Sequence, residues 1–485
     1  MKLNTLLESI AVLEISKGDN PSIEGITHDS RKVQDGFLFV AVSGYRLDGL
    51  DFISDALAKG AVAVVSEAHI NLGSGVVHVQ VEDSRLALAE LSNAYYGNLS
   101  KLLNVVGVTG TNGKTTITYM IRDILRGGGF CPGLLGTVVY EFGNHSVPAS
   151  RTTPEATEIH EMFQQMKEVG CDSVAMEVSS HAIALKRVHG IDFRVTVFTN
   201  LTQDHLDYHN DMESYFDVKS ELFQPPENEL DHAAVINLDD SWGRRLVHER
   251  HLPQRVVTYG FSEEAAVRAV DARIKEDVTC FDVFTPWGNA HICLGLLGRF
   301  NIHNALAALA VGGIFGIQLE TMVKTLETIS AVPGRLELVK NRKGRKIFVD
   351  YAHTDDALKN VLSTLREICR GKLLVVFGCG GGRDRGKRQK MGLVASELAD
   401  FSYVTSDNPR NEDPSVIVSE IVEGFLCQEQ YEIVLDRREA IKKAIRNMGR
   451  KDVLLIAGKG HEAYQEIKGA VVPFDDREIV REILG

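Results

Sequence analysis

The residues best suited to chemistry form a glycine-rich run, GVTGTNGKTT, at positions 107–116. Its glycines let backbone N–H groups close around phosphate oxygens, while Lys114 can neutralise the terminal phosphates and Thr115 can offer a hydroxyl to Mg²⁺. Val108 stands where the strict phosphate-loop pattern has glycine, and the alternative is a simple glycine turn with a solvated lysine. We predict a nucleotide site made of Gly110, Thr111, Asn112, Gly113, Lys114, Thr115 and Thr116.

The elements around this loop predict a parallel α/β sheet. An apolar run at 102–108 is typical of a buried strand leading into the loop, and the apolar spacing at 117–125 predicts the helix that follows. Further buried-strand patterns extend the sheet, and a helical stretch closes the region. These segments lie at 174–176, 195–199, 233–237 and 301–314. The loop therefore belongs to a central domain of the P-loop ATPase type.

Two other α/β domains are expected on either side of this one. Short β-rich runs followed by an amphipathic helix predict a small N-terminal domain; they lie at 37–42, 61–65, 76–81 and 84–96. After a hinge at Val332-Pro333-Gly334, strands alternate with helices in a Rossmann-like, doubly wound pattern. The predicted strands there are 346–349, 373–377, 403–405, 432–435 and 453–457. We expect domains at 1–98, 99–332 and 333–485.

Length and charge narrow the class of protein. At roughly 150 residues per domain, the 485 residues allow about three domains. The 53 basic and 66 acidic residues give a net charge of −13, which opposes binding to nucleic acid or an anionic membrane surface. The first twenty residues lack a signal-peptide core, and no apolar run is long enough to span a bilayer. We expect an enzyme without membrane insertion that binds small anionic ligands.

The cysteines indicate a reducing compartment. There are 7, and their spacing contains no CxxC pair. An odd number of widely spaced cysteines is typical of reduced thiols rather than of a disulfide framework or a zinc site. We therefore expect a cytoplasmic protein. Nothing in the sequence specifies the oligomeric state, and we expect a monomer.

A series of motifs resembles the Mur ligase family, ATP-dependent amino-acid ligases of peptidoglycan synthesis. The motifs span nearly the whole chain: DSRKV from Asp29, TGTNGKTT from Thr109, MEVSSHA from Met176, FTNLTQDHLDYH from Phe198, LGRFNIHN from Leu297, PGRLE from Pro333, DYAHT from Asp350, DNPRNEDP from Asp407 and GKGHEAYQ from Gly458. The resemblance implies ATP and Mg²⁺ as cofactors and a role in cell-wall biogenesis, cell shape and cell division.

Family members convert a substrate carboxylate into an acyl phosphate, which an incoming amine then attacks. Because this step brings two anions together, the site needs cations such as Lys114 and magnesium. The resemblance implies that Glu177 and His205 hold Mg²⁺ with Thr115. It also implies that Lys219 carries a carbamate formed with CO₂, which adds a further anionic ligand. Each of these residues, taken alone, would be interpreted as a solvated or core side chain.

The remaining nucleotide contacts are also implied by the resemblance. Asn301 and Asn304 lie three positions apart, on one helical face, and could present amides to adenine. Asp350 follows a predicted strand, at the edge where α/β proteins bind ligands, and Arg335 belongs to the PGRLE motif. His353, three residues after Asp350, is a further candidate at this edge.

The resemblance assigns the nucleotide-sugar peptide, UDP-N-acetylmuramoyl-L-alanyl-D-glutamate, to the first domain and the adjoining face of the second. The implied contacts are Ser30, Tyr45, Arg46, Leu47, Thr152, Thr153, Ser179 and Arg187. The Arg187 guanidinium suits a carboxylate or phosphate. Two positions depart from the family pattern, since Leu185 replaces a polar amide and Arg151 replaces an asparagine.

The third domain is expected to select the amino acid. Meso-diaminopimelate differs from lysine by a second carboxylate, which a fixed guanidinium can bind through two parallel hydrogen bonds. Arg410 supplies this group, and the alternative is a turn arginine paired with Glu412 or Asp413. Arg385, Lys387 and Arg388 are predicted to form a solvated basic loop. The full predicted amino-acid site is Arg383, Asp407, Asn408, Pro409, Arg410, Gly458 and Glu462.

Two other interpretations remain open. Another Mur ligase, such as a lysine-adding one, or a folylpolyglutamate synthetase would share the phosphate loop and Lys219, but not the DNPR motif or the N-terminal DSRKV segment, and both are present here. An ATP-gated binding scaffold without chemistry would be expected to lack Glu177, His205 or Lys219, and the sequence retains all three. The sequence therefore favours an ATP-dependent ligase that adds meso-diaminopimelate to the D-glutamate of its UDP-linked substrate.

Overall fold

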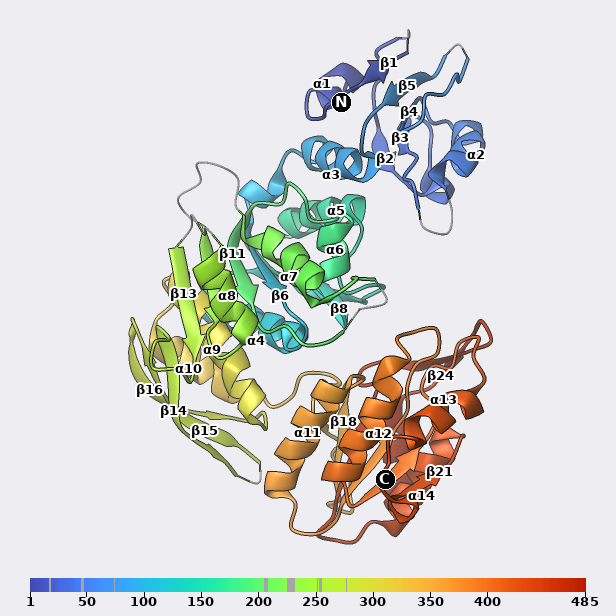
Figure 1. Cartoon of the computed structure of the whole chain (residues 1–485). Coiled ribbons are helices and arrows are strands. Elements are labelled where there is room, and N and C mark those ends of the chain that lie inside the picture. Colours follow the sequence, from blue (N-terminus) through green and yellow to red (C-terminus); the bar gives the residue numbers. More distant parts are fainter. Residues whose placement is uncertain are drawn as a thin grey trace.

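Three α/β domains follow one another along the chain (Figure 1). The computed structural model describes residues 1–16, 19–44, 48–73, 75–204, 208–224, 232–250, 252, 255–275 and 277–485. The N-terminal domain lies against one end of the central domain, and the C-terminal domain lies near another part of it (Figure 1). The predicted α/β class and three-domain architecture are confirmed.

The N-terminal domain is a small sheet covered by helices. Its strands β2 to β5 are parallel, and β1 adds to one edge in the antiparallel direction. The three predicted strands and the helix after them are present, while α1, α2, β1 and β2 were not predicted. The elements are α1 (Leu3–Leu7), β1 (Glu14–Ile15), β2 (Gly25–Thr27), β3 (Phe37–Val40), α2 (Ile53–Ala58), β4 (Ala63–Ser66), β5 (Val77–Gln80) and α3 (Ser84–Tyr95).

The central domain is built on a larger sheet. It begins with β6 (Asn104–Thr109) and α4 (Lys114–Gly127), which flank the glycine-rich loop as predicted. The other elements are β7 (Pro132–Leu135), β8 (Val139–Phe142), β9 (His145–Pro148), α5 (Ala156–Glu168), β10 (Ser173–Glu177), α6 (Ser180–Ala184), β11 (Phe193–Phe198), α7 (Met212–Ser220), β12 (Ala233–Asn237), α8 (Ser241–Glu249), β13 (Arg255–Gly260), β14 (Val267–Ile274), β15 (Thr279–Thr285), β16 (Gly288–Leu294), α9 (Arg299–Ile314) and α10 (Leu319–Thr328).

The predicted parallel sheet is the middle of a longer, mixed one. Among the described residues the order is β16-β15-β14-β13-β12-β11-β6-β10-β7-β8-β9. The strands from β7 to β14 in this order pair in parallel, and antiparallel strands extend both ends. The four predicted strands, β6, β10, β11 and β12, are buried apolar runs, whereas the parallel strands β7, β13 and β14 were not predicted. The antiparallel end strands range from partly buried to fully exposed, so their mixed composition did not reveal them.

The C-terminal domain is doubly wound, as predicted. Its sheet order is β17-β18-β22-β19-β20-β21, with β17 alone antiparallel. Helices α11 to α13 cover one face of the sheet, and α14 and α15 cover the other. The elements are β17 (Glu337–Leu338), β18 (Lys346–Asp350), α11 (Asp355–Ile368), β19 (Leu373–Phe377), α12 (Gly386–Leu398), β20 (Phe401–Val404), α13 (Pro414–Val422), β21 (Tyr431–Ile433), α14 (Arg437–Asn447), β22 (Val453–Ala457), β23 (Tyr464–Ile467), β24 (Ala470–Pro473) and α15 (Asp476–Leu484).

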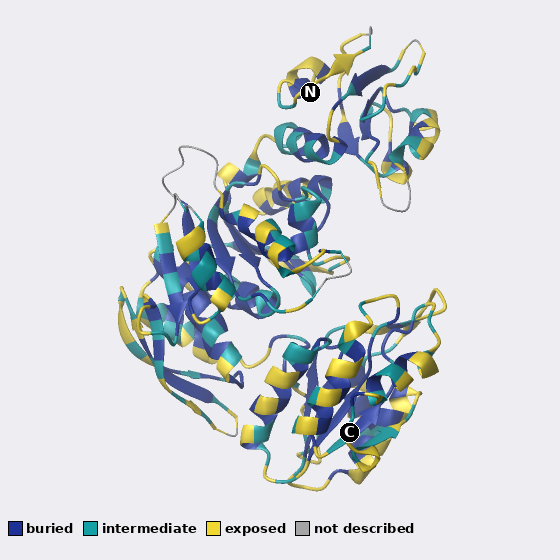
Figure 2. Ribbon diagram, in the orientation of Figure 1, coloured by how far each residue is buried: buried dark blue, intermediate teal, exposed yellow. Residues whose placement is uncertain are grey.

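Burial follows the layers of each domain (Figure 2). The central strands are buried along their length, whereas the outer faces of helices such as α11, α12 and α14 are exposed (Figure 2). Within the described part of the chain, no helix combines the length and apolar character needed to cross a bilayer.

The expectation that every cysteine is a free thiol is wrong for two of the 7 cysteines. A disulfide joins Cys280 on β15 to Cys293 on β16. The two residues are direct cross-strand partners in an antiparallel hairpin. They lie 13 residues apart, so only the hairpin register, which the sequence did not reveal, brings them together.

A buried histidine near the N-terminal domain should make stability depend on pH. His160 on α5 is fully buried, and neither ring nitrogen has a hydrogen-bond partner among the described residues. Burial lowers its pKa to about 4, so between about pH 6.5 and 4 the unfolded state binds more protons and stability falls as pH falls. Lowering the pH from 7.5 to 5 should reduce the free energy of unfolding by about 2 kcal/mol because of this residue.

The variant His160→Leu cannot take up the proton. Its free energy of unfolding should therefore fall by about 2 kcal/mol less than that of the wild type over this pH range. Urea unfolding of both proteins at several pH values measures the difference. His145→Leu on the exposed strand β9 is the matched control and should follow the wild type. Identical pH profiles for His160→Leu and wild type would contradict the assignment.

Candidate active site

The glycine-rich loop closes tightly at the carboxyl end of β6. Gly110 and Gly113 have φ of 142° and 90°, in the region that favours glycine. A Cβ atom on Gly110 would lie 1.8 Å from Thr199 Oγ1, and one on Gly113 would lie 2.7 Å from Asn304 Oδ1. The loop therefore needs glycine at both positions, for conformation and for space. Its backbone N–H groups then lie at the N-terminus of α4, which favours an anion.

Two lysines lie at this loop. Lys114 Nζ donates hydrogen bonds of 2.9 Å to the carbonyl oxygens of Gly110 and Thr111. Lys219, on α7, is 1% exposed and donates at 3.1 Å to Gly110 O and at 3.3 Å to Thr109 Oγ1. Burial lowers the pKa of Lys114, and burial together with the charge of Lys114 lowers that of Lys219 well below its usual value. The fold thus places two buried amines beneath the loop, and for Lys219 this burial favours the neutral form.

A cavity of about 520 Å³ opens above the loop. Its wall combines residues from the central and C-terminal domains. The predicted site residues that line it are Thr111, Asn112, Gly113, Lys114, Thr115, Thr116, Thr152, Glu177, Ser179, Asn304, Arg335, Asp350 and His353. Among the predicted nucleotide residues, Gly110 and Asn301 lie behind this wall.

Glu177 lies at the end of β10 and faces the loop from the neighbouring strand. It is 1% exposed and accepts hydrogen bonds from the backbone N–H (2.8 Å) and the hydroxyl (3.0 Å) of Thr137. Arg335 donates to Thr115 Oγ1 at 2.8 Å, so a cationic group already contacts the hydroxyl predicted to face a metal. A hydroxyl and a carboxylate are hard oxygen donors, which fit Mg²⁺. His205, the other predicted ligand, lies outside the described residues.

One end of the cavity is lined by α9. Asn304 donates from Nδ2 to Asn301 Oδ1 at 2.9 Å, and Asn301 donates to Leu297 O at 2.8 Å. The two predicted amides are therefore linked, with Asn304 at the surface and Asn301 supporting it. His303 pairs with Asp239 at 2.8 Å on the same wall. The sequence does not reveal this pair, because its members lie 64 positions apart.

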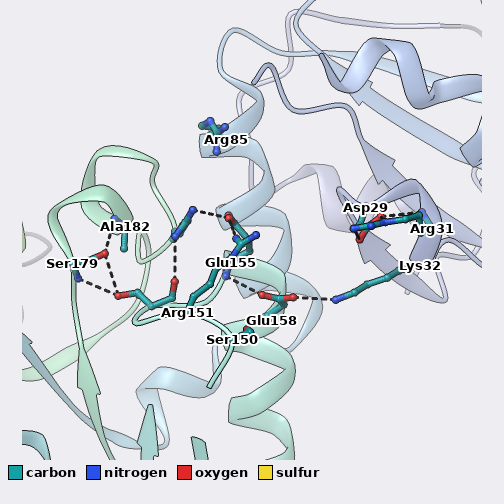
Figure 3. Close-up of polar contacts among 12 residues, drawn as sticks. Asp29, Arg31, Lys32, Arg85, Ser150, Arg151, Glu155, Glu158, Ser179 and Ala182 are labelled. Atoms are coloured by element: carbon teal, nitrogen blue, oxygen red, sulfur yellow. Dashed lines mark hydrogen bonds and ion pairs between the residues drawn. The ribbon is translucent and has the colours of Figure 1, made fainter. Parts of the chain in front are cut away.

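The predicted substrate residues of the central domain form one network. Thr153 Oγ1 donates to Glu177 O at 2.9 Å and accepts from Ser179 N at 3.1 Å. Arg187 donates to Thr153 O at 3.2 Å and pairs with Glu155 at 2.8 Å. Arg151 pairs with the same carboxylate. Glu155, whose role the sequence does not reveal, therefore holds both arginines beside the Thr153–Ser179 corner. Figure 3 shows Glu155 and Arg151 in the same region as Ser179.

The N-terminal domain faces this network. Lys32 extends toward Glu158 and pairs with it at 3.0 Å (Figure 3). Ser30, two residues earlier, is buried, and its carbonyl accepts a hydrogen bond of 2.9 Å from Lys59. The other predicted contacts in this domain, Tyr45, Arg46 and Leu47, lie outside the described residues.

A second cluster forms where β20 and β22 end in the C-terminal domain. Asn408 donates to Glu462 Oε2 at 2.9 Å, and its Oδ1 accepts from buried Lys459 at 3.1 Å. A Cβ atom on Gly458 would lie 2.5 Å from Asp407 Oδ2, so the two loops touch. The structure thus brings Asp407 and Asn408 together with Gly458 and Glu462, although Asn408 and Glu462 lie 54 positions apart in sequence. Lys459, missed in the sequence analysis, links them.

Arg410 is held in place on the same loop. Its Nη1 donates to Gly381 O at 2.7 Å, and its Nε pairs with Glu466 at 3.1 Å, not with Glu412 or Asp413. Its side chain remains 26% exposed. A Cβ atom on Gly380 would lie 2.9 Å from Arg410 Nη1 and 3.8 Å from Arg383 Cγ. Both arginines therefore lie around one glycine segment.

One prediction for the neighbouring basic loop is wrong. Arg388 is fully buried, and it pairs with Glu412 at 3.0 Å and Glu420 at 2.7 Å. It follows Arg385, which is 65% exposed as predicted. The helix α12 turns Arg388 inward, and two acidic partners on the next segment compensate its charge. The sequence offered no periodic signal that distinguishes the two arginines.

Glycines let the C-terminal loops meet beside the central domain. A Cβ atom on Gly334 would lie 2.1 Å from His461 N, and one on Gly460 would lie 2.7 Å from Tyr351 Cβ. Asp350 ends β18 here, and burial raises its pKa to about 6. Across the cavity, Asp356 accepts a hydrogen bond of 2.9 Å from Asn112 Nδ2 on the phosphate loop. The C-terminal domain thus contributes Asp350 and Asp356 to the nucleotide cavity, whereas the predicted amino-acid residues do not line it.

Comparison with known proteins identifies the family. Residues 22–96 match the Mur ligase family, catalytic domain; residues 108–312 match the Mur ligase middle domain; and residues 334–460 match the Mur ligase, glutamate ligase domain. The chain belongs to the Mur ligase family. The resemblance deduced from its motifs is confirmed.

Among Mur ligases, full-length relatives share a common description. The chain is 42% identical to the UDP-N-acetylmuramoyl-L-alanyl-D-glutamate--2,6-diaminopimelate ligase of Bacillus cereus, over 100% of this chain and 98% of the relative. It is 44% identical to the ligase of that name from Geobacter metallireducens, over 99% and 98%. A solved structure of a ligase with this description is 33% identical and superposes with a TM-score of 0.68, covering 95% of this chain and 94% of the other.

Proposed function

We propose that this Mur ligase uses ATP to join meso-diaminopimelate to the D-glutamate of UDP-N-acetylmuramoyl-L-alanyl-D-glutamate. The γ-phosphate first activates the substrate carboxylate as an acyl phosphate. The amine of diaminopimelate then attacks, and phosphate and ADP leave. This reaction belongs to cytoplasmic synthesis of peptidoglycan precursors, and its support is the full-length similarity to relatives described as this ligase.

The observation that carries the proposal is the arrangement around one cavity edge. The phosphate loop and its lysines lie on one side, and the C-terminal loops approach it through Arg335 and Asp356. The Thr153–Ser179 corner lies beside Glu177 on the sugar-peptide side. A ligase with three substrates needs its donor, acceptor and nucleotide to meet in this way.

The cations proposed for catalysis have distinct positions. Thr115 and Glu177 would hold Mg²⁺, which when bound supplies charge neutralisation at the transferring phosphoryl group. Lys114 neutralises the same phosphates from the protein side. The lowered pKa of Lys219 favours its neutral amine, which can add CO₂ and release one proton to become a carbamate. By resemblance to the family, this carbamate would be a metal ligand in addition to His205.

Turnover with defined substrates tests the proposal. Purified chain is incubated with ATP, Mg²⁺ and UDP-N-acetylmuramoyl-L-alanyl-D-glutamate, together with meso-diaminopimelate, L-lysine or no amino acid. We expect phosphate release and a UDP-linked tripeptide with diaminopimelate. Absence of product with every amino acid would contradict the ligase proposal, and a preference for lysine would contradict the choice of substrate alone.

Arg410 should determine the affinity for diaminopimelate. Its guanidinium is fixed by Gly381 and Glu466 yet part exposed, so it can form charge-assisted hydrogen bonds to the distal carboxylate. Arg410→Ala should raise KM for diaminopimelate about 100-fold, as expected for 2–3 kcal/mol of charged hydrogen bonding. Arg410→Lys keeps the charge and should recover only part of the loss, because it lacks the planar fork.

KM for ATP should change less than about twofold in both variants, because Arg410 lies outside the nucleotide cavity. Arg385→Ala is the matched control, since this arginine is on the adjacent loop and 65% exposed. Its kinetic constants should equal those of the wild type. An unchanged KM for diaminopimelate in Arg410→Ala would rule out the carboxylate contact.

A further inference from the structure

The hairpin β15–β16 carries a cluster of side chains that the ligase reaction does not use. Cys280 is opposite Cys293, and Asp282 is opposite His291. Because side chains alternate along a strand, these two neighbouring pairs project from the same face of the hairpin. The ligating atoms of Cys280, His291 and Cys293 all lie within 4.8 Å of one another. None of the four residues lines the nucleotide cavity.

The imidazole of His291 is oriented toward the two sulfurs. Its Nδ1 lies 2.6 Å from Asp282 Oδ1, so this nitrogen carries the proton and donates to the carboxylate. In the neutral ring Nε2 then keeps a lone pair, and it lies 3.5 Å from Cys293 Sγ. Metal-binding histidines are characteristically held in this way by a carboxylate on the other ring nitrogen. A disulfide alone requires neither the imidazole nor its acidic partner.

We propose that the reduced thiols of Cys280 and Cys293, together with His291 Nε2, bind a zinc-class divalent metal ion. Thiolate and imidazole are the ligands that Zn²⁺ prefers, whereas Mg²⁺ and Ca²⁺ prefer oxygen. Asp282 is a positioning residue that fixes the His291 ring. The His291 side chain is 64% exposed, so solvent can supply the fourth ligand of a tetrahedral site.

The disulfide and the metal site are alternative states of the same two cysteines. A dithiol reagent reduces the disulfide by supplying two electrons and two protons, and it leaves as its own cyclic disulfide. Each resulting thiol then loses its proton when the metal binds, because the thiolate is the ligand. Metal binding should therefore require the reduced chain. The oxidised chain, in which both sulfurs are bonded to each other, should bind none.

The test uses the full chain, reduced and kept free of oxygen, titrated with Co²⁺ and then with Zn²⁺. We expect one equivalent of Co²⁺ to produce a thiolate charge-transfer absorption that Zn²⁺ abolishes. Cys293→Ser and His291→Ala should each weaken binding at least about 10-fold, and Asp282→Asn about 10- to 100-fold, through loss of the histidine's support. Zn²⁺ should also raise the Tm of the reduced wild type.

Cys131→Ser is the matched control, because the Cys131 thiol lies beside Cys171 in another thiol pair of the chain. This variant should bind Co²⁺ as the wild type does. His291→Ala and Asp282→Asn change exposed side chains, so both variants should fold. They therefore test the proposal even if a cysteine variant does not fold. The proposal is overturned if the reduced wild type binds no Co²⁺, or if His291→Ala binds it with unchanged affinity and spectrum.

Discussion

Lys114→Met should lower kcat of the ligase reaction about 10³-fold, the effect expected when one preorganised charge is removed from a transferring phosphoryl group. In the structure, Lys114 Nζ contacts only carbonyl oxygens of its own loop, Gly110 and Thr111, among the described residues. The ammonium is therefore available to phosphate when ATP binds. Methionine keeps the length of the side chain, so the start of α4 should be preserved. Steady-state kinetics with saturating ATP measures the effect.

Arg126→Met is the matched control for this variant. Arg126 lies on the same helix, in its last turn, and its side chain is 52% exposed. The substitution removes one positive charge from the end of α4 that lies away from the loop. The kcat of this variant should therefore remain within about twofold of the wild type. Equal Tm values for wild type and Lys114→Met would show that folding is intact. A kcat reduced less than about 10-fold would contradict the role given to Lys114.

Arg437→Met should destabilise the C-terminal domain by about 3–5 kcal/mol, because it leaves Asp476 buried without its counter-charge. Both side chains are 0% exposed, and they form two hydrogen bonds of 2.9 and 2.7 Å. Arg437 also donates to Ala457 O at 3.0 Å and to Ser406 O at 3.5 Å. These carbonyls immediately precede Gly458 and Asp407, so the ion pair ties together the two loops of the proposed amino-acid site.

Hydrogen exchange followed by mass spectrometry measures this loss, because it reports opening of the C-terminal domain separately from the rest. Exchange of β22 amides should accelerate more than about 100-fold. The double variant Arg437→Met/Asp476→Leu removes both charges. It should destabilise the C-terminal domain much less than the sum of the two single substitutions. The loops should also loosen, which would raise KM for diaminopimelate in the single variant.

The neighbouring residue Arg438 offers a close control. It forms an ion pair of 2.6 Å with Glu482, and the two side chains are 52% and 56% exposed. Exposed pairs contribute about 1 kcal/mol or less, so Arg438→Met should leave β22 exchange nearly unchanged. Equal effects of Arg437→Met and Arg438→Met would show that burial of the first pair does not matter to stability.

The sequence predicted an element best where nearly all of its residues are apolar. The strand predictions at 233–237, 373–377 and 453–457 coincide with β12, β19 and β22, because buried parallel strands are continuous apolar runs. The two-residue strand β1 and the half-exposed hairpins at the ends of the central sheet were missed. Their stability depends on neighbours that lie beside them only after folding, so a short window of sequence does not specify them.

The candidate site also has residues that the sequence predicts and residues that it does not. Gly110, Gly113, Lys114 and Arg410 belong to local motifs, whose chemistry can be predicted from residue type and spacing. Glu155, which holds two arginines, was not legible, because its role comes from partners 4 and 32 positions away that only the fold brings together. The same holds for the acidic partners that bury Arg388.

By itself, the sequence determined the phosphate loop, the three α/β domains and the family. The loop and the family motifs are short contiguous segments, and the domains follow from the spacing of apolar residues within single elements. Only the tertiary structure decided which charges are buried, which partners compensate them, and that Cys280 faces Cys293 across a hairpin. Burial and pairing depend on contacts between residues far apart in the chain. Such contacts follow from the packing and register of whole elements, which no single segment encodes.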